Sequence, residues 1–379
     1  MSLKALLLCS DDKIVRVLRR TLGDLDIAVE LCPNADAALR KLTRQRYEAI
    51  IVDCAGEGSE EVLRSSRNAP CNKQAVAVAI LEPVVGLKVA FGIGAHFVLY
   101  KPVSVERAKS SFRAARALMK SERRRNTRVA VQIPVVMRNL AGGANLKVTT
   151  TDLSEGGLAV ALPQGRHPAG RWQIVMTLPG SDSALEIPGE LAWEGTGSQA
   201  GVRFQAMSME TEYHLREWIK QNSTETEQDD PPIRCQLTDL SLGGCYLELP
   251  SPFPPASRVL LSMRAGELEM RAQGVVRVMH PEKGMGVEFT QKTAEQRSAV
   301  EKFLHTLSEN RGLRPELMVE PEGLENDSIH SSRQPHDPED PLLKLFYSDA
   351  MSAEAFQDAL REQRSLSTPQ AAGMMAAHA

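Results

Sequence analysis

Short apolar runs alternate with amphipathic segments along the first 120 residues of the chain. The apolar runs have the length of strands buried on both faces, and they lie at 6–9, 27–31, 49–52, 75–81 and 97–100. The segments with helical spacing of apolar residues lie at 12–22, 35–42, 60–65, 84–91 and 103–118. This alternation predicts a doubly wound parallel sheet, an α/β domain over residues 1–120.

The pattern changes after residue 120 to short β-rich runs that are separated by glycine and proline. These runs lie at 129–137, 146–151, 158–162, 173–178, 186–193 and 201–204. Their spacing predicts a small β-barrel or sandwich over residues 121–222, with a helix at 211–220 that closes it or packs on its outside.

The β-rich pattern occurs a second time over residues 233–308. The stretch 238–244 parallels 151–157 at an offset of 87. Gly274 and Gly286 begin runs that parallel those at Gly189 and Gly201, at an offset of 85. A repeat of this length predicts a second domain of the same fold.

The C-terminal part of the chain has two textures. Residues 309–340 are polar and rich in Pro, Glu, Asp, Ser and His, which predicts a disordered linker. Residues 341–366 regain helical spacing and predict short amphipathic helices, which typically dock on a partner or self-associate. We therefore expect an unidentified protein partner or a homo-oligomer.

Composition and charge exclude several classes of protein. The 45 Lys and Arg residues and 48 Asp and Glu residues leave a formal charge of -3, so the chain is no bulk polycation. Aromatic residues make up 4%, too few for the stacking surfaces of single-stranded nucleic-acid binders. No apolar stretch approaches ~18 residues, the length of a membrane span. We expect a cytoplasmic protein with no membrane span and no DNA binding, since a helix-turn-helix pattern is missing.

The spacing of cysteine and histidine argues against a zinc site, a disulfide framework and a catalytic constellation. The six cysteines contain no CxxC pair, and the eight histidines are scattered. We therefore expect reduced cysteines and no enzymatic activity.

Polar residues follow three of the strands predicted in the first domain, at the sheet edge where such folds bind ligands. Asp11 and Asp12 follow the first strand, Asp53 the third and Lys101 the fifth. Three carboxylates at one edge can hold a divalent cation through oxygen ligands, and an aspartate can accept a phosphoryl group.

This arrangement, with the dipeptide Lys101-Pro102, resembles the receiver domain of response regulators. The resemblance implies that Asp53 is the phospho-acceptor and that Lys101 contacts the phosphate. It also implies that Asp11, Asp12 and Asp53 bind Mg²⁺.

Two positions depart from the receiver pattern. The hydroxyl residue that the family has at the end of its fourth strand falls on Ala79 or Ile80, and the switch aromatic falls on Val98. The first domain is therefore either phosphorylated by a histidine kinase or a pseudo-receiver that serves docking or dimerisation.

Two motifs stand out in the first β-rich domain. Residues 122–128 contain four arginines, whose planar, permanently charged guanidinium groups bind phosphates and guanine edges bidentately. Residues 152–157 place a carboxylate, a hydroxyl and glycine in one turn. The carboxylate can accept from guanine N–H groups, the hydroxyl can bond phosphate, and glycine permits close backbone approach.

The two motifs, 24 residues apart, are similar to the RRxxxR and (D/N)xSxxG patterns of PilZ domains, which are receptors for cyclic di-GMP. The resemblance spans about residues 122–221 and implies that cyclic di-GMP is the ligand. The implied contacts are Arg123, Arg124, Arg128, Asp152, Ser154 and Gly157.

The second β-rich domain lacks this arginine run. An acidic segment at 223–232 and a lone Arg234 precede it. Acidic side chains repel a doubly anionic ligand, so we expect this domain to bind no nucleotide by itself. A looser alternative has Arg234 complete a weak second site.

The expected architecture is a receiver-like (βα)5 domain, two PilZ-like β-barrel domains, a disordered linker and short C-terminal helices. The expected function is a signalling adaptor in which cyclic di-GMP changes the domain arrangement or the binding of a partner. Two alternatives stay open: a phosphorelay response regulator that uses Asp53, and an interaction scaffold that senses nothing.

Overall fold

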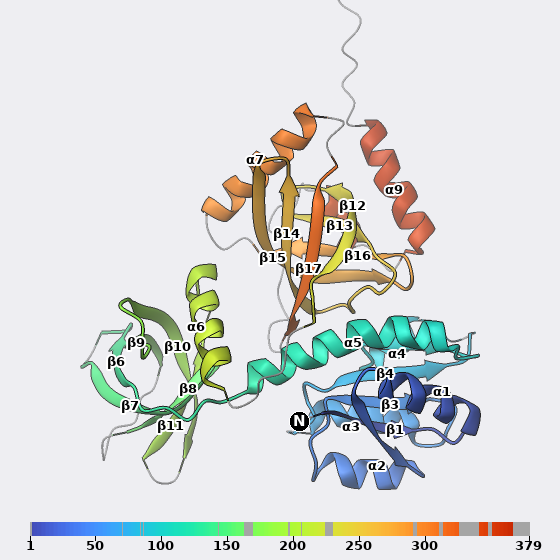
Figure 1. Ribbon diagram of the computed structural model, residues 1–379, viewed down its shortest axis with the longest axis horizontal. Helices are drawn as coiled ribbons and strands as arrows, with labels where there is room; N and C mark the ends of the chain where they lie inside the picture. Colours follow the sequence, from blue (N-terminus) through green and yellow to red (C-terminus); the bar gives the residue numbers. More distant parts are fainter. Residues whose placement is uncertain are drawn as a thin grey trace, which may run out of the picture. The chain divides into compact units, whose positions relative to one another are not determined.

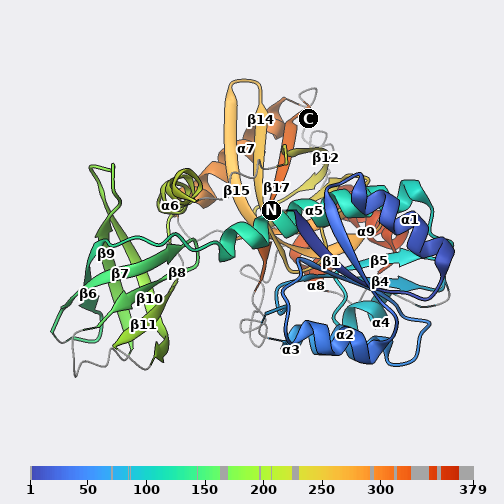
Figure 2. The same cartoon turned by 60° about the horizontal axis from the view of Figure 1, so that its bottom comes forward.

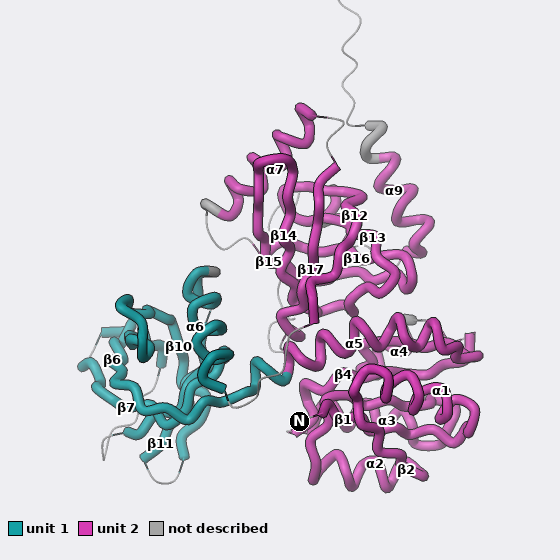
Figure 3. The backbone as a smooth tube through the Cα atoms, in the orientation of Figure 1, with its two compact units in different colours: residues 1, 123–229 teal, residues 2–122, 230–379 magenta. Residues whose placement is uncertain are grey.

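The computed structural model divides the chain into two compact units, residues 123–229 together with residue 1, and residues 2–122 together with 230–379 (Figure 3). The residues that it describes are 2–69, 71–83, 85, 87–142, 144–162, 170–195, 198–205, 207–223, 230–290, 294–310, 314–325, 341–347 and 351–366.

The N-terminal domain is the α/β fold that the sequence predicts (Figure 1). Its strands are β1 (Leu3–Leu8), β2 (Ile27–Cys32), β3 (Ala49–Asp53), β4 (Val76–Leu81) and β5 (Phe97–Tyr100). Its helices are α1 (Asp12–Gly23), α2 (Ala35–Leu42), α3 (Ser59–Asn68), α4 (Leu87–Gly92) and α5 (Val105–Asn126). All strand pairs are parallel, in the order β2-β1-β3-β4-β5, which is a doubly wound order shared with receiver domains.

Helices cover both faces of this sheet, which explains its continuous apolar strands. Figure 2 shows α1 and α5 on one face, and α2, α3 and α4 on the other. Leu18 of α1 and Phe112 of α5 belong to one apolar core, while Leu42 of α2 and Val62 of α3 belong to a second.

Helix α5 is longer than its apolar spacing predicts, because it continues past residue 118 to Asn126. Its extension includes Lys120 and Glu122, which are polar yet buried. Asp230 accepts hydrogen bonds from Lys120 Nζ at 3.0 Å and from Arg116 Nη1 at 2.6 Å, and Glu122 accepts one from the backbone N–H of Leu324. These partners lie more than 100 residues away in sequence, so the local pattern contained no sign of them.

Residues 123–229 form a closed barrel with the strand order β10-β11-β8-β7-β6-β9. The strands are β6 (Pro134–Asn139), β7 (Leu146–Ser154), β8 (Gly157–Ala161), β9 (Arg171–Thr177), β10 (Ala184–Gly195) and β11 (Gln199–Phe204). Helix α6 (Met209–Asn222) packs on the barrel through Leu215, Trp218 and Ile219, which join its apolar core.

The second barrel belongs to the other unit and has the strand order β12-β13-β16-β15-β14-β17. Its elements are β12 (Ile233–Leu240), β13 (Gly244–Glu248), β14 (Ser257–Ala265), β15 (Leu268–His280), β16 (Gly284–Phe289), helix α7 (Ala294–Glu309) and β17 (Glu316–Leu324). The predicted fold class is thereby confirmed: a receiver-like sheet followed by two barrels.

Strand β17 corrects the disordered linker expected over 309–340. It pairs with β12 and β14 and so takes the position that β6 has in the first barrel, which makes the second barrel a circular permutation of the first. Its buried Leu317 and Val319 alternate with the exposed Glu316 and Met318, but this apolar methionine, Pro321 and several glutamates hid the strand pattern. Residues 311–313 and 326–340 of the expected linker lie outside the described part of the chain.

The C-terminal helices α8 (Pro341–Tyr347) and α9 (Ala353–Leu366) pack on the second barrel. Among the described helices, none is long and apolar enough to cross a membrane.

Candidate functional site

The arginine-rich segment 123–128, which we call the arginine arm, is bound to the end of β7. Val129 and Leu153 exchange two backbone hydrogen bonds, at 2.8 and 2.9 Å. This bridge places Arg128 beside Asp152, with 2.5 Å between Arg128 Nη1 and Asp152 Oδ1. The two residues that carry the paired motifs are therefore in direct contact.

The preceding arginines lie in the last turn of α5, where Arg123 and Arg124 are both partly exposed. Arg124 Nε lies 3.3 Å from Oε1 of Glu155, which belongs to the turn between β7 and β8. Arg216 Nε of α6 lies 3.9 Å from Glu155 Oε2. Glu155 thus holds the arm and the closing helix against the turn. The arm is a structured segment, and a ligand would exchange these ion pairs for its own contacts.

Ser154 and Gly157 shape the turn rather than face solvent. The buried Ser154 hydroxyl donates to the carbonyl of Gly157 at 2.9 Å. A Cβ on Gly157 would lie 2.3 Å from the carbonyl oxygen of Val202, so only glycine lets β8 approach β11 this closely. The repeat has the same arrangement: the Ser241 hydroxyl donates to the carbonyl of Gly244 at 3.3 Å.

Sequence reasoning assigned no role to Trp193, which the fold brings onto the same face as Asp152. Asp152 is paired with Ala159, Ala159 with Gly201, and Gly201 with Trp193 across β7, β8, β11 and β10. Directly paired residues of antiparallel strands point to the same side of a sheet. We call these four residues the outer row of the first barrel.

Two small residues, Ala159 and Gly201, separate the carboxylate of the outer row from its indole. Trp193 is 42% exposed, and a Cβ on Gly201 would lie 2.0 Å from its Nε1 atom. A tryptophan at an outward-facing strand position is the sequence signal that could have identified this residue as part of the site.

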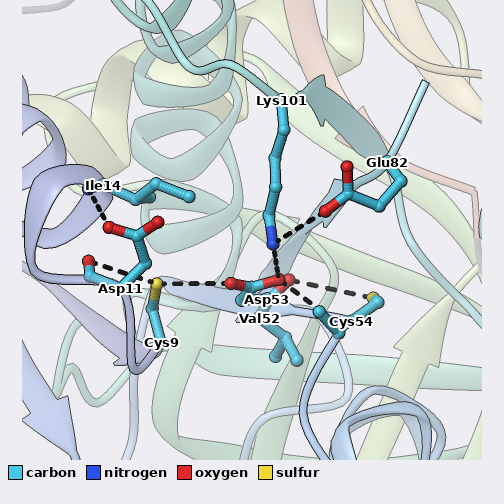
Figure 4. A network of polar contacts seen from close by, with 9 residues as sticks. Cys9, Asp11, Ile14, Val52, Asp53, Cys54, Glu82 and Lys101 are labelled. Carbon is cyan, nitrogen blue, oxygen red and sulfur yellow. Dashed lines mark hydrogen bonds and ion pairs between the residues drawn. The ribbon is translucent and has the colours of Figure 1, made fainter.

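The receiver-like domain brings Asp53 and Lys101 together at the carboxyl edge of its sheet (Figure 4). Lys101 Nζ lies 2.9 Å from Asp53 Oδ1 and 3.3 Å from Glu82 Oε1. Cys9 Sγ approaches the other oxygen of Asp53 at 3.6 Å. Burial is the main reason that the pKa of Cys9 rises to about 11, so its thiol is neutral near pH 7.

Asp11 and Asp12 do not join Asp53, contrary to the magnesium set that the sequence led us to expect. Strand β1 ends at Leu8, so Cys9 is the residue that faces Asp53, and Asp11 instead caps α1. Asp11 Oδ1 accepts from the N–H groups of Lys13 at 2.7 Å and Ile14 at 3.3 Å, and these bonds lower its pKa.

The residues around Asp53 do not fit a magnesium ion. Mg²⁺ requires oxygen ligands in octahedral array, whereas the groups that contact the Asp53 carboxylate are an ammonium group, a neutral thiol and the backbone N–H of Ala55. Across the described residues, no three His, Cys, Asp or Glu side chains are grouped to hold a metal. Ala79 and Ile80, the two candidates for the hydroxyl position, are both buried in β4.

The PilZ domain model matches two adjoining stretches of the chain, residues 122–221 and 222–305. The matches coincide with the two barrels, except that the second stops before β17. No curated protein matches the chain.

Solved structures resemble single domains of the chain. The receiver domain of a sensor histidine kinase from Pseudomonas aeruginosa PAO1, with magnesium in its active-site cleft, is 21% identical; the match covers 32% of this chain and 99% of that one, with a TM-score of 0.28. The chemotaxis response regulator CheY4 of Vibrio cholerae is 20% identical over 30% of this chain and 99% of its own, with a TM-score of 0.29. The PilZ domain of CeSA from a cellulose-synthesizing bacterium is 22% identical over 25% and 95%, with a TM-score of 0.21.

Proposed function

We propose that this chain, a receiver-like domain with two tandem PilZ domains, is a signalling adaptor that responds to cyclic di-GMP bound on its first barrel. The observation that carries the proposal is the contact between Arg128 and Asp152, which joins the two halves of the PilZ motif at one end of the outer row. The finer assignment of ligand contacts follows from the chemistry of these side chains.

The ligand offers two phosphates and two guanines, and the site has a group for each. Arg123, Arg124 and Arg128 would bind phosphate oxygens or guanine edges, and Asp152 would accept from guanine N–H groups. Trp193 would stack on a base at the other end of the outer row. Ser154 and Gly157 would contribute by keeping the turn in shape.

Binding requires the ligand to open ion pairs that are already present. Arg128 is 52% and Asp152 27% exposed, and a pair so accessible to water contributes only ~0.2–1 kcal/mol. Each hydrogen bond from arginine to a charged group of the ligand contributes ~1.5–3 kcal/mol. The exchange is therefore favourable when several of the arginines engage together.

Helix α5 offers a route from the ligand site to the other unit. The boundary between the units falls at residues 122 and 123, where the arginine arm begins. Just before it, Lys120 and Glu122 hold α5 to Asp230 and to the end of β17. We propose that ligand binding at 123–128 changes the arrangement of the two units and thereby the affinity for a partner protein.

The proposal has no enzymatic or DNA-binding step, and it assigns the receiver-like domain to docking. All six cysteines lack disulfide bonds, which fits a reducing compartment and a cytoplasmic site of action. A phosphorelay is the second candidate, because Lys101 lies 2.9 Å from Asp53. A mass gain at Asp53 on incubation with a histidine kinase, or with a small phosphodonor and Mg²⁺, would favour that candidate.

Calorimetric titration of the full chain with cyclic di-GMP tests the proposal. Arg128→Ala and Asp152→Ala should each weaken binding at least tenfold, which corresponds to one lost charge-assisted hydrogen bond. Asp239→Ala, the equivalent change in the second barrel, and Arg138→Ala, which removes an exposed pair with Glu186, should leave the affinity unchanged. Equal losses from Asp239→Ala would place the site elsewhere, and no saturable binding to the wild-type chain would remove the proposal.

A further inference from the structure

The second barrel has an outer row of its own, and its chemistry is different. The pairing across β12, β13, β16 and β15 joins Asp239, Tyr246, Gly286 and Val278. A tyrosine thus stands where the first barrel has Ala159, and a valine stands where it has Trp193.

Helices α8 and α9 cover the outer row of the second barrel. A Cβ on Gly286 would lie 2.5 Å from Cε1 of Phe346, and a Cβ on Gly244 would lie 3.0 Å from Cε2 of the same ring. Phe356 of α9 lies 5.3 Å from the Tyr246 ring, centroid to centroid, and its ring is stacked on Phe346 at 5.9 Å. The glycines leave the space that the phenylalanine of α8 fills.

Polar contacts fix the position of the helices on this face. His280 Nδ1 lies 2.9 Å from the Tyr246 hydroxyl, and its Nε2 lies 3.4 Å from the carbonyl oxygen of Met351 just before α9. Lys283 forms an ion pair with Glu354 in the first turn of α9. Burial lowers the pKa of His280; Lys283 adds to this shift, and Glu354 and the bond to Met351 oppose it.

The helices form a layer that is distinct from the barrel interior. Tyr246 groups with Leu342, Phe346, Phe356 and Leu360 in one apolar cluster, whereas Val276, Met285 and Val287 belong to the barrel core. Removing the helices would therefore uncover one face of the barrel and leave its core intact.

We propose that the outer face of the second barrel is a helix-docking site, and that two copies of the chain exchange their α8–α9 pairs through it. Fifteen residues, 326–340, connect the end of the barrel to α8. A chain of that length can span up to about 50 Å, so the covalent connection does not determine which copy supplies the helices. Mutual exchange joins two chains into a closed dimer.

Docking at this face also gives the second barrel a role other than nucleotide binding. While α8 and α9 are docked, Phe346 and Phe356 cover the surface that corresponds to the outer row of the first barrel. The apolar cluster of α8 and α9 consists of residues from the second barrel and the two helices, within the unit of residues 2–122 and 230–379.

Two full-length variants with complementary defects test the exchange. Phe356→Asp removes an apolar contact of α9 and leaves the outer face of the second barrel, which we call the seat, intact. Tyr246→Glu places a charge in the seat and leaves the helices intact. In each variant alone, we expect a monomer in which the amides of α9 exchange with solvent at least tenfold faster than in the wild-type chain. Arg361→Ala, on an exposed side chain of α9, is the matched control and should keep the wild-type exchange rate.

An equimolar mixture of the two variants should form a dimer that neither forms alone, since one chain offers a seat and the other a helix pair. Analytical ultracentrifugation measures the dimer, and circular dichroism shows that both chains are folded. A mixture of folded variants that stays monomeric would overturn the exchange between copies. If the α9 amides of Phe356→Asp exchange their hydrogens with solvent as slowly as those of the wild-type chain, the docking itself would be overturned.

Discussion

Replacing Trp193 by alanine probes the outer row of the first barrel without touching the arginine arm. The indole lies against Gly201 and Gly195 on the outside of the barrel, and it is absent from the apolar core that contains Trp172 and Trp218. A surface change of this kind usually alters the free energy of unfolding by less than about 0.5 kcal/mol. Any loss of binding would therefore report on the ligand contact.

The expected loss follows from what one ring face can offer. Trp193 is 42% exposed and its indole lies against Gly201, so the accessible part of the ring can stack on one base. Stacking of a base on an aromatic side chain contributes ~1–3 kcal/mol. Since 1.4 kcal/mol is tenfold in affinity, Trp193→Ala should raise the Kd for cyclic di-GMP about 5- to 150-fold.

Titration calorimetry and tryptophan fluorescence measure this effect independently. Trp172 and Trp218 are buried, so a change in emission on ligand addition should come from Trp193 and disappear in Trp193→Ala. Trp193→Phe keeps an aromatic face and should recover part of the affinity. Leu140→Ala removes another exposed apolar side chain of this unit and should bind normally.

A Trp193→Ala chain that binds cyclic di-GMP within twofold of the wild type would refute the reasoning, because no base would then lie on the outer row. A ligand-induced emission change that survives the substitution would do the same. The contribution of Arg128 and Asp152 would stand in either case, since those contacts are tested by their own variants.

Three further changes test other parts of the structure. Asp230→Asn removes the carboxylate that binds Arg116 and Lys120, so local opening of α5 should become easier by about 1–3 kcal/mol, measured by hydrogen exchange at residues 114–122; unchanged exchange would contradict that anchoring. The lowered pKa of His280 means that the docked helices favour its neutral form, while an undocked histidine titrates near ~6.5. Docking should thus be fully stable above that pH and weaken as the pH falls through it. Amide hydrogen exchange of α9 should then be faster at pH 5 than at pH 7.5, and this difference should be absent in His280→Gln. The wild-type chain should show no saturable Mg²⁺ binding at millimolar concentration, because the residues around Asp53 do not fit the ion. Cys9→Asp places a second carboxylate beside Asp53 and should create a site. Saturable binding to the wild-type chain would contradict this reasoning.

The pattern of apolar and polar residues within a short segment was enough to predict individual helices, strands and turns. Leu18 and Leu22 on one face of α1, and the apolar run of β3, predict their elements because helices and buried strands have distinct periods. The glycine-containing turns at 152–157 and 239–244 predicted the duplication for the same reason, since each turn is specified by its own few residues.

Part of the candidate site was also predictable. Arg128 and Asp152 belong to motifs that the sequence already joined, and the structure places them in contact. Ser154 and Gly157 are predicted ligand contacts, and the structure adds two constraints on them. The Ser154 hydroxyl donates to the carbonyl of Gly157 within the turn, and Gly157 lies against the carbonyl oxygen of Val202, which only strand packing brings near. Asp11 was read as a metal ligand because no pattern shows that the strand before it ends at Leu8.

The local elements, the repeat and the residue types available for chemistry could be predicted, because they depend on neighbours along the chain. Which distant segments meet became clear only in the folded chain. Folding recruited β17 into the second barrel, extended α5 through Lys120 and Glu122, aligned Trp193 with Asp152, and seated Phe346 on Gly286. Each of these depends on pairing between residues far apart in sequence, whose free energy arises only when the chain is folded.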